Sequence, residues 1–300
     1  MTRHFHIRMK GNMQGESTSY ESSANQTVLK GYGLAALDLP TQDKIPPVQR
    51  LMMADKGGLA LDIGAGLGYT TRSVFADRPT VCVDLNEANL HYLRDRVAAV
   101  ASARPPLCVV ARAAALPFRA GAFQYILCSE VLEHIEDDDS AAEEIARVLA
   151  DDGRGVITVP YTGIGLTSFL AALKIKTVHD YPGPEHHVRA GYDERSLVRL
   201  LSAHGLEVAE FAFYFRFFTR LTTDGISLFH LMYQRLLRHR TAWNWSDVAA
   251  DEDSLTMRVY GRIFPLLASA RRLDKWLAQR RGFGLVAAFH HPVTKDRASE

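Results

Sequence analysis

Three glycines at alternate positions stand out in residues 61–71, which read LDIGAGLGYTT. Gly64, Gly66 and Gly68 follow a short apolar run and precede a helical pattern. Glycine lets the backbone turn tightly and approach a ligand with no Cβ in the way. The unpaired N–H groups at the start of the following helix then face that ligand. The pattern therefore predicts a strand, a tight turn and a helix that form one wall of a binding site.

Two aspartates flank this turn and indicate what the ligand carries. Asp84 ends the next apolar run, twenty residues after Gly64, where a carboxylate can accept hydrogen bonds from both hydroxyls of a ribose. Asp62 lies in the strand before the turn, where its carboxylate can hold an ammonium group but would repel a pyrophosphate. Tyr69 also stands where the dinucleotide fingerprint requires glycine. S-adenosylmethionine therefore fits better than a nicotinamide dinucleotide, which makes a nicotinamide oxidoreductase a disfavoured alternative.

The elements around the turn predict an α/β fold with a doubly wound parallel sheet. Nearly continuous apolar runs are typical of strands that are buried on both faces. They occupy residues 59–63, 80–84, 107–111, 125–129 and 155–160. Helical stretches alternate with them over residues 68–78, 86–103 and 138–150. The three cysteines, Cys82, Cys108 and Cys128, lie inside these strands and are predicted to be core residues.

The flanking regions are less regular. A short helix is expected to start near Val48, because Pro46 and Pro47 interrupt the segment before it. Further along, we expect a helix over 163–176, a loop over 180–192 and a helix over 193–205. A strand is expected over 206–218, with its alternate phenylalanines (211, 213, 215 and 217) on one face. Helices over 225–281 and a last strand over 284–292 are expected after it.

Five strings in order give the chain its resemblance to a known family. They are LALDIGAGLGYTT, VCVDLN, ALPFRAGAFQYILCSEVLEHI, LADDGRGVITVP and EHHVRAGYDERSLVRLLSAHGLEV. With them the chain resembles the class I S-adenosylmethionine-dependent methyltransferases that act on small molecules. The resemblance covers roughly residues 45–210 and the closing strand. It implies a seven-stranded, mostly parallel, Rossmann-like sheet, with the last strand antiparallel beside the sixth and a helical insertion before that last strand.

The same resemblance divides the chain and assigns cofactor-binding residues. It implies an N-terminal arm or cap over 1–45, a catalytic domain over 46–292 with the insertion at about 219–281, and a tail over 293–300. The methionine part of the cofactor would lie against Asp62, Ile63, Gly64, Ala65, Gly66 and Gly68. Asp84 would bind the ribose and Leu85 would lie beside the adenine. Arg112, where the family often has an acid, and Ala113 would flank the adenine. Ser129 and Glu130 would lie under the sulfonium.

A cluster of titratable residues follows the fourth predicted strand. Glu130, Glu133 and His134 are spaced to share one helix face, and the loop with His186 and His187 can approach the same pocket. The pattern resembles the metal site of small-RNA 2′-O-methyltransferases and of ubiquinone-biosynthesis O-methyltransferases, where such residues could hold a divalent cation. It also occurs in metal-free relatives. Three roles stay open for this cluster: a metal site, a general base, or purely structural histidines. The candidate catalytic residues are Glu130, His134 and His187.

The cofactor defines the reaction and leaves the acceptor open. A sulfonium methyl group is already electrophilic, so the protein must align a nucleophile and, where needed, remove a proton. We expect an oxygen acceptor on a small or lipid-like metabolite. N- or C-methylation, an RNA 2′-O-methyltransferase and a non-catalytic cofactor-binding module are the alternatives. Thirty-five basic and thirty-four acidic residues nearly cancel, so nucleic acid is not expected as a partner.

The sequence also bears on location and partners. The N-terminal residues show no apolar signal segment, no run of about eighteen apolar residues occurs, and three cysteines favour a reducing compartment, so a cytoplasmic protein is expected. Arginine clusters and tryptophans accompany the apolar helix faces predicted over 226–281. Core packing is the simplest interpretation of those faces, and peripheral contact with a membrane surface or an amphiphilic substrate is the alternative.

Overall fold

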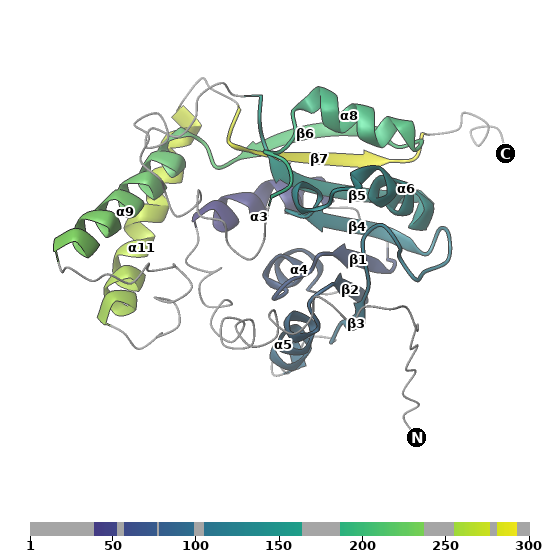
Figure 1. Ribbon diagram of the computed structural model, residues 1–300, viewed down its shortest axis with the longest axis horizontal. Helices are drawn as coiled ribbons and strands as arrows, with labels where there is room; N and C mark the ends of the chain where they lie inside the picture. The colour runs from purple at the N-terminus through teal and green to yellow at the C-terminus, as the bar shows by residue number, and fades with distance from the viewer. Residues whose placement is uncertain are drawn as a thin grey trace.

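The computed structural model describes residues 39–52, 57–76, 78–98, 105–163, 187–236, 255–276 and 281–292. In these residues a seven-stranded sheet carries helices on both faces (Figure 1). The predicted helix over 163–176, most of the predicted arm, the tail and His186 lie outside the described residues.

The strand order confirms the predicted α/β sheet. In spatial order the strands are β3 (Leu107–Val110), β2 (Thr80–Asp84), β1 (Ala60–Ile63), β4 (Phe123–Ser129), β5 (Leu149–Pro160), β7 (Gly284–His290) and β6 (Glu207–Tyr214). The pairs among β1 to β5 are parallel, and β7 is antiparallel to both β5 and β6. The last strand is therefore antiparallel beside the sixth, as the resemblance implied.

In the first half of the chain, most strands are followed in sequence by a helix. They are α3 (Leu39–Met52), α4 (Tyr69–Phe75), α5 (Glu87–Ala98), the 3₁₀ turn η1 (Leu132–His134), α6 (Asp138–Val148), α8 (Glu194–Ala203), α9 (Phe217–Leu236), α11 (Leu255–Leu273) and the 3₁₀ turn η3 (Asp274–Trp276). Asp193 caps α8 by accepting a hydrogen bond from the backbone N–H of Ser196 at 2.7 Å, which confirms the predicted start of that helix.

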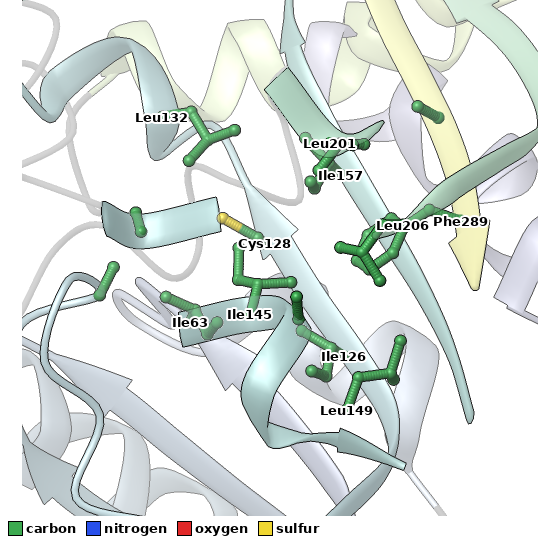
Figure 2. Close-up of a cluster of buried hydrophobic side chains, with 14 of the residues drawn as sticks. Ile63, Ile126, Cys128, Leu132, Ile145, Leu149, Ile157, Leu201, Leu206 and Phe289 are labelled. Atoms are coloured by element: carbon green, nitrogen blue, oxygen red, sulfur yellow. The ribbon is translucent and has the colours of Figure 1, made fainter. Parts of the chain in front are cut away.

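Alternate side chains of the central strands enter two different cores. Ile126 and Cys128 of β4 pack in the core that α6 and α8 cover, and Figure 2 shows this cluster. Tyr125 and Leu127 of the same strand pack on the other face, under α3 and α4. Both faces of the sheet are thus buried, which explains why its strands are almost continuously apolar. Cys82 and Cys128 are buried and Cys108 is half-buried, so the predicted core placement of the cysteines is confirmed for two and partial for the third.

The prediction of a short helix near Val48 was wrong in extent. The helix α3 begins at Leu39 and continues through Pro46 and Pro47. Two prolines remove two backbone donors from the helix interior. The side chains of Val48 and Leu51 are buried against the sheet, and this packing offsets the lost hydrogen bonds.

The predicted strand over 206–218 was too long. The strand β6 ends at Tyr214, and Phe217 already begins α9. Phe215 has a left-handed backbone (φ 54°), and its N–H donates to Asp43 Oδ2 of α3 at 2.6 Å. This tertiary contact ends the strand, so Phe215 packs in the core beneath α3, and Phe217 is exposed at the start of a helix.

The predicted helical insertion is present as α9 and α11. These two helices lie side by side and stand away from the sheet, at the left of Figure 1. In the part of the chain that the structure describes, no helix is both long enough and apolar enough to span a bilayer.

Candidate active site

The carboxyl ends of β1, β2 and β4 meet at one edge of the sheet, and this edge, called the crevice below, carries the predicted binding residues. The strand β1 has β2 on one side and β4 on the other, so the connections that leave the sheet here run in opposite directions. Open α/β sheets bind their ligands at such a switch point. The glycine turn follows β1, Asp84 ends β2, and Ser129 ends β4.

The three glycines of the turn have two different roles. A Cβ on Gly64 would lie 2.3 Å from a Val131 methyl carbon, and one on Gly68 would lie 2.6 Å from Leu93. These two glycines therefore allow close packing inside the protein. A Cβ on Gly66 would meet no atom within 4 Å, although its φ of +52° favours glycine. Gly66 thus faces open space, and the close approach of a ligand to it stays a prediction.

Asp84 lies beside this turn and already holds part of it. Its Oδ2 accepts a hydrogen bond from the N–H of Gly66 at 2.8 Å, and its Oδ1 accepts one from the N–H of Asn86 at 2.8 Å. The two bonds fix the orientation of the carboxylate at the end of β2. Leu85 is 64% exposed next to it, an uncommon environment for a large apolar side chain. This geometry suits a ribose and a flat apolar ring system.

Asp62 is buried beneath the turn. Its Oδ2 accepts a hydrogen bond from the hydroxyl of Thr71 in the first turn of α4. Burial raises the pKa of Asp62 to about 7, while the Thr71 hydrogen bond and the positive charge of Lys44 act in the opposite direction. A ligand ammonium group nearby would further favour the ionised carboxylate.

The end of β3 lies next to Asp84. The N–H of Ala111 donates to the backbone carbonyl of Asp84 at 3.3 Å, and Arg112 and Ala113 follow at once. Ala113 is buried and Arg112 is exposed. Both residues are therefore at the level of the crevice, and their contact with an adenine ring stays a prediction.

Glu130 is held by a chain of hydroxyl groups. Its Oε1 accepts hydrogen bonds from Thr158 Oγ1 at 2.9 Å and from Tyr214 Oη at 2.5 Å. Because the Thr158 proton points to Glu130, the hydroxyl of Ser129 donates to Thr158, at 3.0 Å. Burial and the neighbouring Glu130 carboxylate raise the pKa of Tyr214 well above its ordinary value, so Tyr214 remains a donor.

The prediction that Glu130, Glu133 and His134 share one helix face was wrong. Glu130 has a left-handed backbone (φ 56°) and precedes the 3₁₀ turn η1. The i, i+3, i+4 spacing therefore does not describe an α-helix face here. Glu130 points to Thr158 and Tyr214 instead of joining the other two residues.

Glu133, His134 and His187 do meet. One ligand atom from each lies within 4.8 Å of the others, and the two imidazole rings are 4.5 Å apart between centroids at an interplanar angle of 87°. The Glu133 side chain is almost fully buried, and its Oε1 lies 3.9 Å from His134 Nε2. The N–H of Val188 donates to the Glu133 carbonyl at 2.9 Å, which brings His187 to η1. The set offers a possible base and the donor types that a divalent cation accepts.

Sequence reasoning missed the residues that support this site. Thr71 could have been found, because a hydroxyl residue in the first turn of the helix after the glycines can reach back to Asp62. Thr158 and Tyr214 gave no local signal. Their role depends on the pairing of β4 with β5 and on the place of β6 in the sheet.

Residues 61–157 match the family model of a methyltransferase domain. These residues run from β1 through most of β5 and contain the glycine turn, Asp84 and the pair of Glu133 and His134. The match covers about a third of the chain, and over these residues the parallel part of the seven-stranded sheet agrees with a methyltransferase domain.

Individual relatives differ in what they do. Malonyl-acyl-carrier-protein O-methyltransferase of Halorhodospira halophila is 35% identical over 96 residues, which cover 31% of this chain and 32% of the relative. The chain therefore matches about a third of the length of that curated relative. The solved structure of the cyclase SpnF superposes with a TM-score of 0.54 at 18% identity, covering 85% of this chain and 82% of SpnF. Phosphoethanolamine N-methyltransferase 2 of Haemonchus contortus, in complex with S-adenosylmethionine, gives a TM-score of 0.55 at 17% identity over 91% of this chain and 59% of its own. These two structures are similar in fold alone, and the fold does not define the acceptor.

Proposed function

We propose that this chain transfers a methyl group from S-adenosylmethionine to an oxygen of a small or lipid-like metabolite, and that the oxygen is a hydroxyl. The observation that carries the proposal is the contact of His134 with His187, next to the buried Glu133, at the turn η1 that follows the carboxyl end of β4. A hydroxyl must lose its proton on methylation, and an imidazole is suited to accept it near neutral pH. The name of the Halorhodospira relative, a malonyl-acyl-carrier-protein O-methyltransferase, agrees with an oxygen acceptor, although a malonyl group offers a carboxylate oxygen and not a hydroxyl.

The cofactor supplies a methyl group that is activated by its sulfonium charge. Asp84 would accept hydrogen bonds from the ribose hydroxyls, and the N–H groups of the glycine turn would face the methionine part. Asp62 would attract the ammonium group. Ser129 and Glu130 would lie beneath the sulfonium, where the hydroxyls of Thr158 and Tyr214 keep the Glu130 carboxylate fixed.

The histidines would act on the acceptor side. His134 or His187 would hydrogen-bond to the acceptor hydroxyl and take its proton as the methyl group is transferred. The buried carboxylate of Glu133, 3.9 Å from His134, would stabilise the imidazolium that results. The same three side chains fit a divalent cation by donor type, and a cation held there would lower the pKa of the acceptor hydroxyl.

The test is a methyl-transfer assay on an extract of the native host with isotope-labelled S-adenosylmethionine, followed by identification of the labelled compound. A labelled ether supports the proposal. A methyl ester at a carboxyl group, or label on nitrogen or carbon, overturns the hydroxyl assignment while leaving methyl transfer intact. No labelled product despite S-adenosylhomocysteine binding would indicate a non-catalytic module.

Variants then separate the base from the fold. His134→Ala and His187→Ala should each lower kcat by about 100-fold and leave S-adenosylhomocysteine affinity unchanged. The matched control is His204→Ala, because His204 lies at the end of α8 and pairs with Asp139 at 2.9 Å. Loss of activity on chelation, restored by a divalent cation, would assign the three residues to a metal site instead of a base.

A further inference from the structure

The helical hairpin formed by α9 and α11 is firmly joined to the protein at its base. Asp274 of η3 is buried and accepts hydrogen bonds from the N–H of Phe218 at 2.7 Å and from the N–H and hydroxyl of Thr219 at 3.1 and 2.8 Å. Arg220 pairs with the buried Asp224 at 3.1 Å. The Asp274 contacts join the start of α9 to the end of α11, and the Arg220–Asp224 pair lies within α9. The two helices project together from the sheet (Figure 1).

One stripe of α9 is both apolar and exposed. Phe217, Leu221 and Leu228 are 49%, 46% and 38% exposed. Their spacings of four and seven residues place them on the same side of the helix. Thr219, on the opposite side of α9, is buried. The buried Asp224 lies on the same side as the stripe, between Leu221 and Leu228, and interrupts it.

The second helix repeats this arrangement. Ile263, Leu266 and Leu273 of α11 are exposed at spacings of three and seven residues, and Leu266 is 74% exposed. Trp276 in η3 continues the stripe and is 88% exposed. Seven of the twelve exposed large apolar residues in the described part of the chain lie on α9, α11 and η3. Such a concentration on one projecting unit indicates an interaction surface.

The charge of this region identifies the partner. Residues 216–281 contain twelve Lys and Arg against six Asp and Glu, in a chain whose formal net charge is +1. Two of those six acids, Asp224 and Asp274, are buried. Arg262 and Arg272 are exposed next to Ile263 and Leu273 of the apolar stripe. Apolar stripes flanked by arginines are typical of helices that lie in the interface of an anionic membrane.

We propose that the α9–α11 hairpin docks on the surface of an anionic lipid bilayer. The apolar stripes would enter the boundary between headgroups and acyl chains, the arginines would contact the lipid phosphates, and Trp276 would lie at the interface. Both stripes extend along their helices, as contact with a planar surface requires. The proposal does not depend on the methyl acceptor.

Vesicle sedimentation of the full chain tests the proposal. We expect binding to vesicles of phosphatidylcholine with phosphatidylglycerol and little binding to phosphatidylcholine alone. Leu266→Glu should reduce the binding constant by about tenfold or more, since it removes apolar burial and adds a repelled charge. Arg272→Glu should reduce it by at least about fivefold, the equivalent of about 1 kcal/mol per positive charge.

Leu107→Glu is the matched control. Leu107 is 63% exposed on β3, at the opposite edge of the sheet from β6, and its replacement should leave vesicle binding unchanged. All variants should bind S-adenosylhomocysteine as the parent chain does, which shows that they are folded. The proposal is overturned if the parent chain does not bind anionic vesicles, or if Leu266→Glu binds them as well as Leu107→Glu does. It is also overturned if Leu266→Glu abolishes only self-association, or only the capture of an acidic protein.

Discussion

Asp84 connects the end of β2 to the glycine turn through a single carboxylate. Replacing it with alanine removes the predicted acceptor of the ribose hydroxyls and the partner of the Gly66 N–H. We expect Asp84→Ala to weaken S-adenosylhomocysteine binding by about 1–3 kcal/mol, because charge-assisted hydrogen bonds are lost. Calorimetric titration measures this, with Asp95→Ala on the exposed face of α5 as the control. Unchanged affinity in a folded Asp84→Ala protein would remove Asp84 from the site.

Gly66 allows a second test at the residue scale, because Gly205 has the same local properties far from the crevice. Both glycines have positive φ, and a Cβ on either would meet no atom within 4 Å. Each alanine variant should lose about 1 kcal/mol of stability from backbone strain.

Only Gly66→Ala should also weaken S-adenosylhomocysteine binding, by about tenfold or 1.4 kcal/mol, since the added methyl group enters the space where the ligand approaches. Denaturant unfolding and calorimetry on the two variants separate strain from ligand contact. Equal affinities would show that the ligand does not approach Gly66.

The turn and the two aspartates could be predicted because their roles depend on nearby backbone. Gly66 and Asp84 are brought together by adjacent parallel strands, which the alternation of elements already indicated. The environment of Glu130 could not be predicted. Glu130 has a left-handed backbone and accepts hydrogen bonds from Thr158 and Tyr214. These two residues lie on other strands, 28 and 84 residues further along the chain. A spacing rule for α-helices fails at such a position.

Asp274 shows at the element scale how the helical hairpin depends on one side chain. Asp274→Ala would leave the N–H groups of Phe218 and the buried Thr219 without their acceptor in the first turn of α9. We expect a loss of about 2 kcal/mol in the free energy of unfolding and faster hydrogen exchange confined to α9 and α11.

Asp137→Ala is the comparison for this variant, because Asp137 caps α6 at an exposed position. It should cost about 1 kcal/mol or less and leave the exchange of α9 unchanged. Equal exchange rates for α9 in the two variants would contradict the role of Asp274.

Elements with continuous apolar runs could be located from the sequence, and elements defined by tertiary contacts could not. The strand β2 was predicted with its observed bounds, since burial on both faces leaves a clear pattern. The end of β6 depends on the bond between Phe215 and Asp43, which are 172 residues apart. The alternating phenylalanines before and after this point therefore suggested a longer strand than the protein forms.

The buried carboxylate of Asp62 affects the stability of the whole molecule. Its pKa rises from 3.8 to about 7 on folding, so between these values the folded protein keeps a proton that the unfolded chain has released. The contribution of Asp62 to the free energy of unfolding therefore decreases as the pH rises from about 4 to about 7, and is constant above that.

Asp62→Asn removes this titration while its amide oxygen can still accept from Thr71. Relative to the parent chain, the variant should gain up to about 4 kcal/mol between pH 4 and pH 8, as an order of magnitude. Urea unfolding at a series of pH values measures the difference. Parallel curves for the two proteins would show that Asp62 is not buried as an acid.

The place of β7 between β5 and β6 has a consequence for biosynthesis. Within the described sheet β6 pairs with β7 alone, yet β7 is the last of the seven strands to leave the ribosome. A nascent chain can thus assemble the parallel strands and the cofactor crevice while β6 still lacks its neighbour. Tyr214 at the end of β6 reaches Glu130 only when that C-terminal strand has inserted. The hydrogen-bonded support of Glu130 is therefore the last part of this edge of the sheet to form.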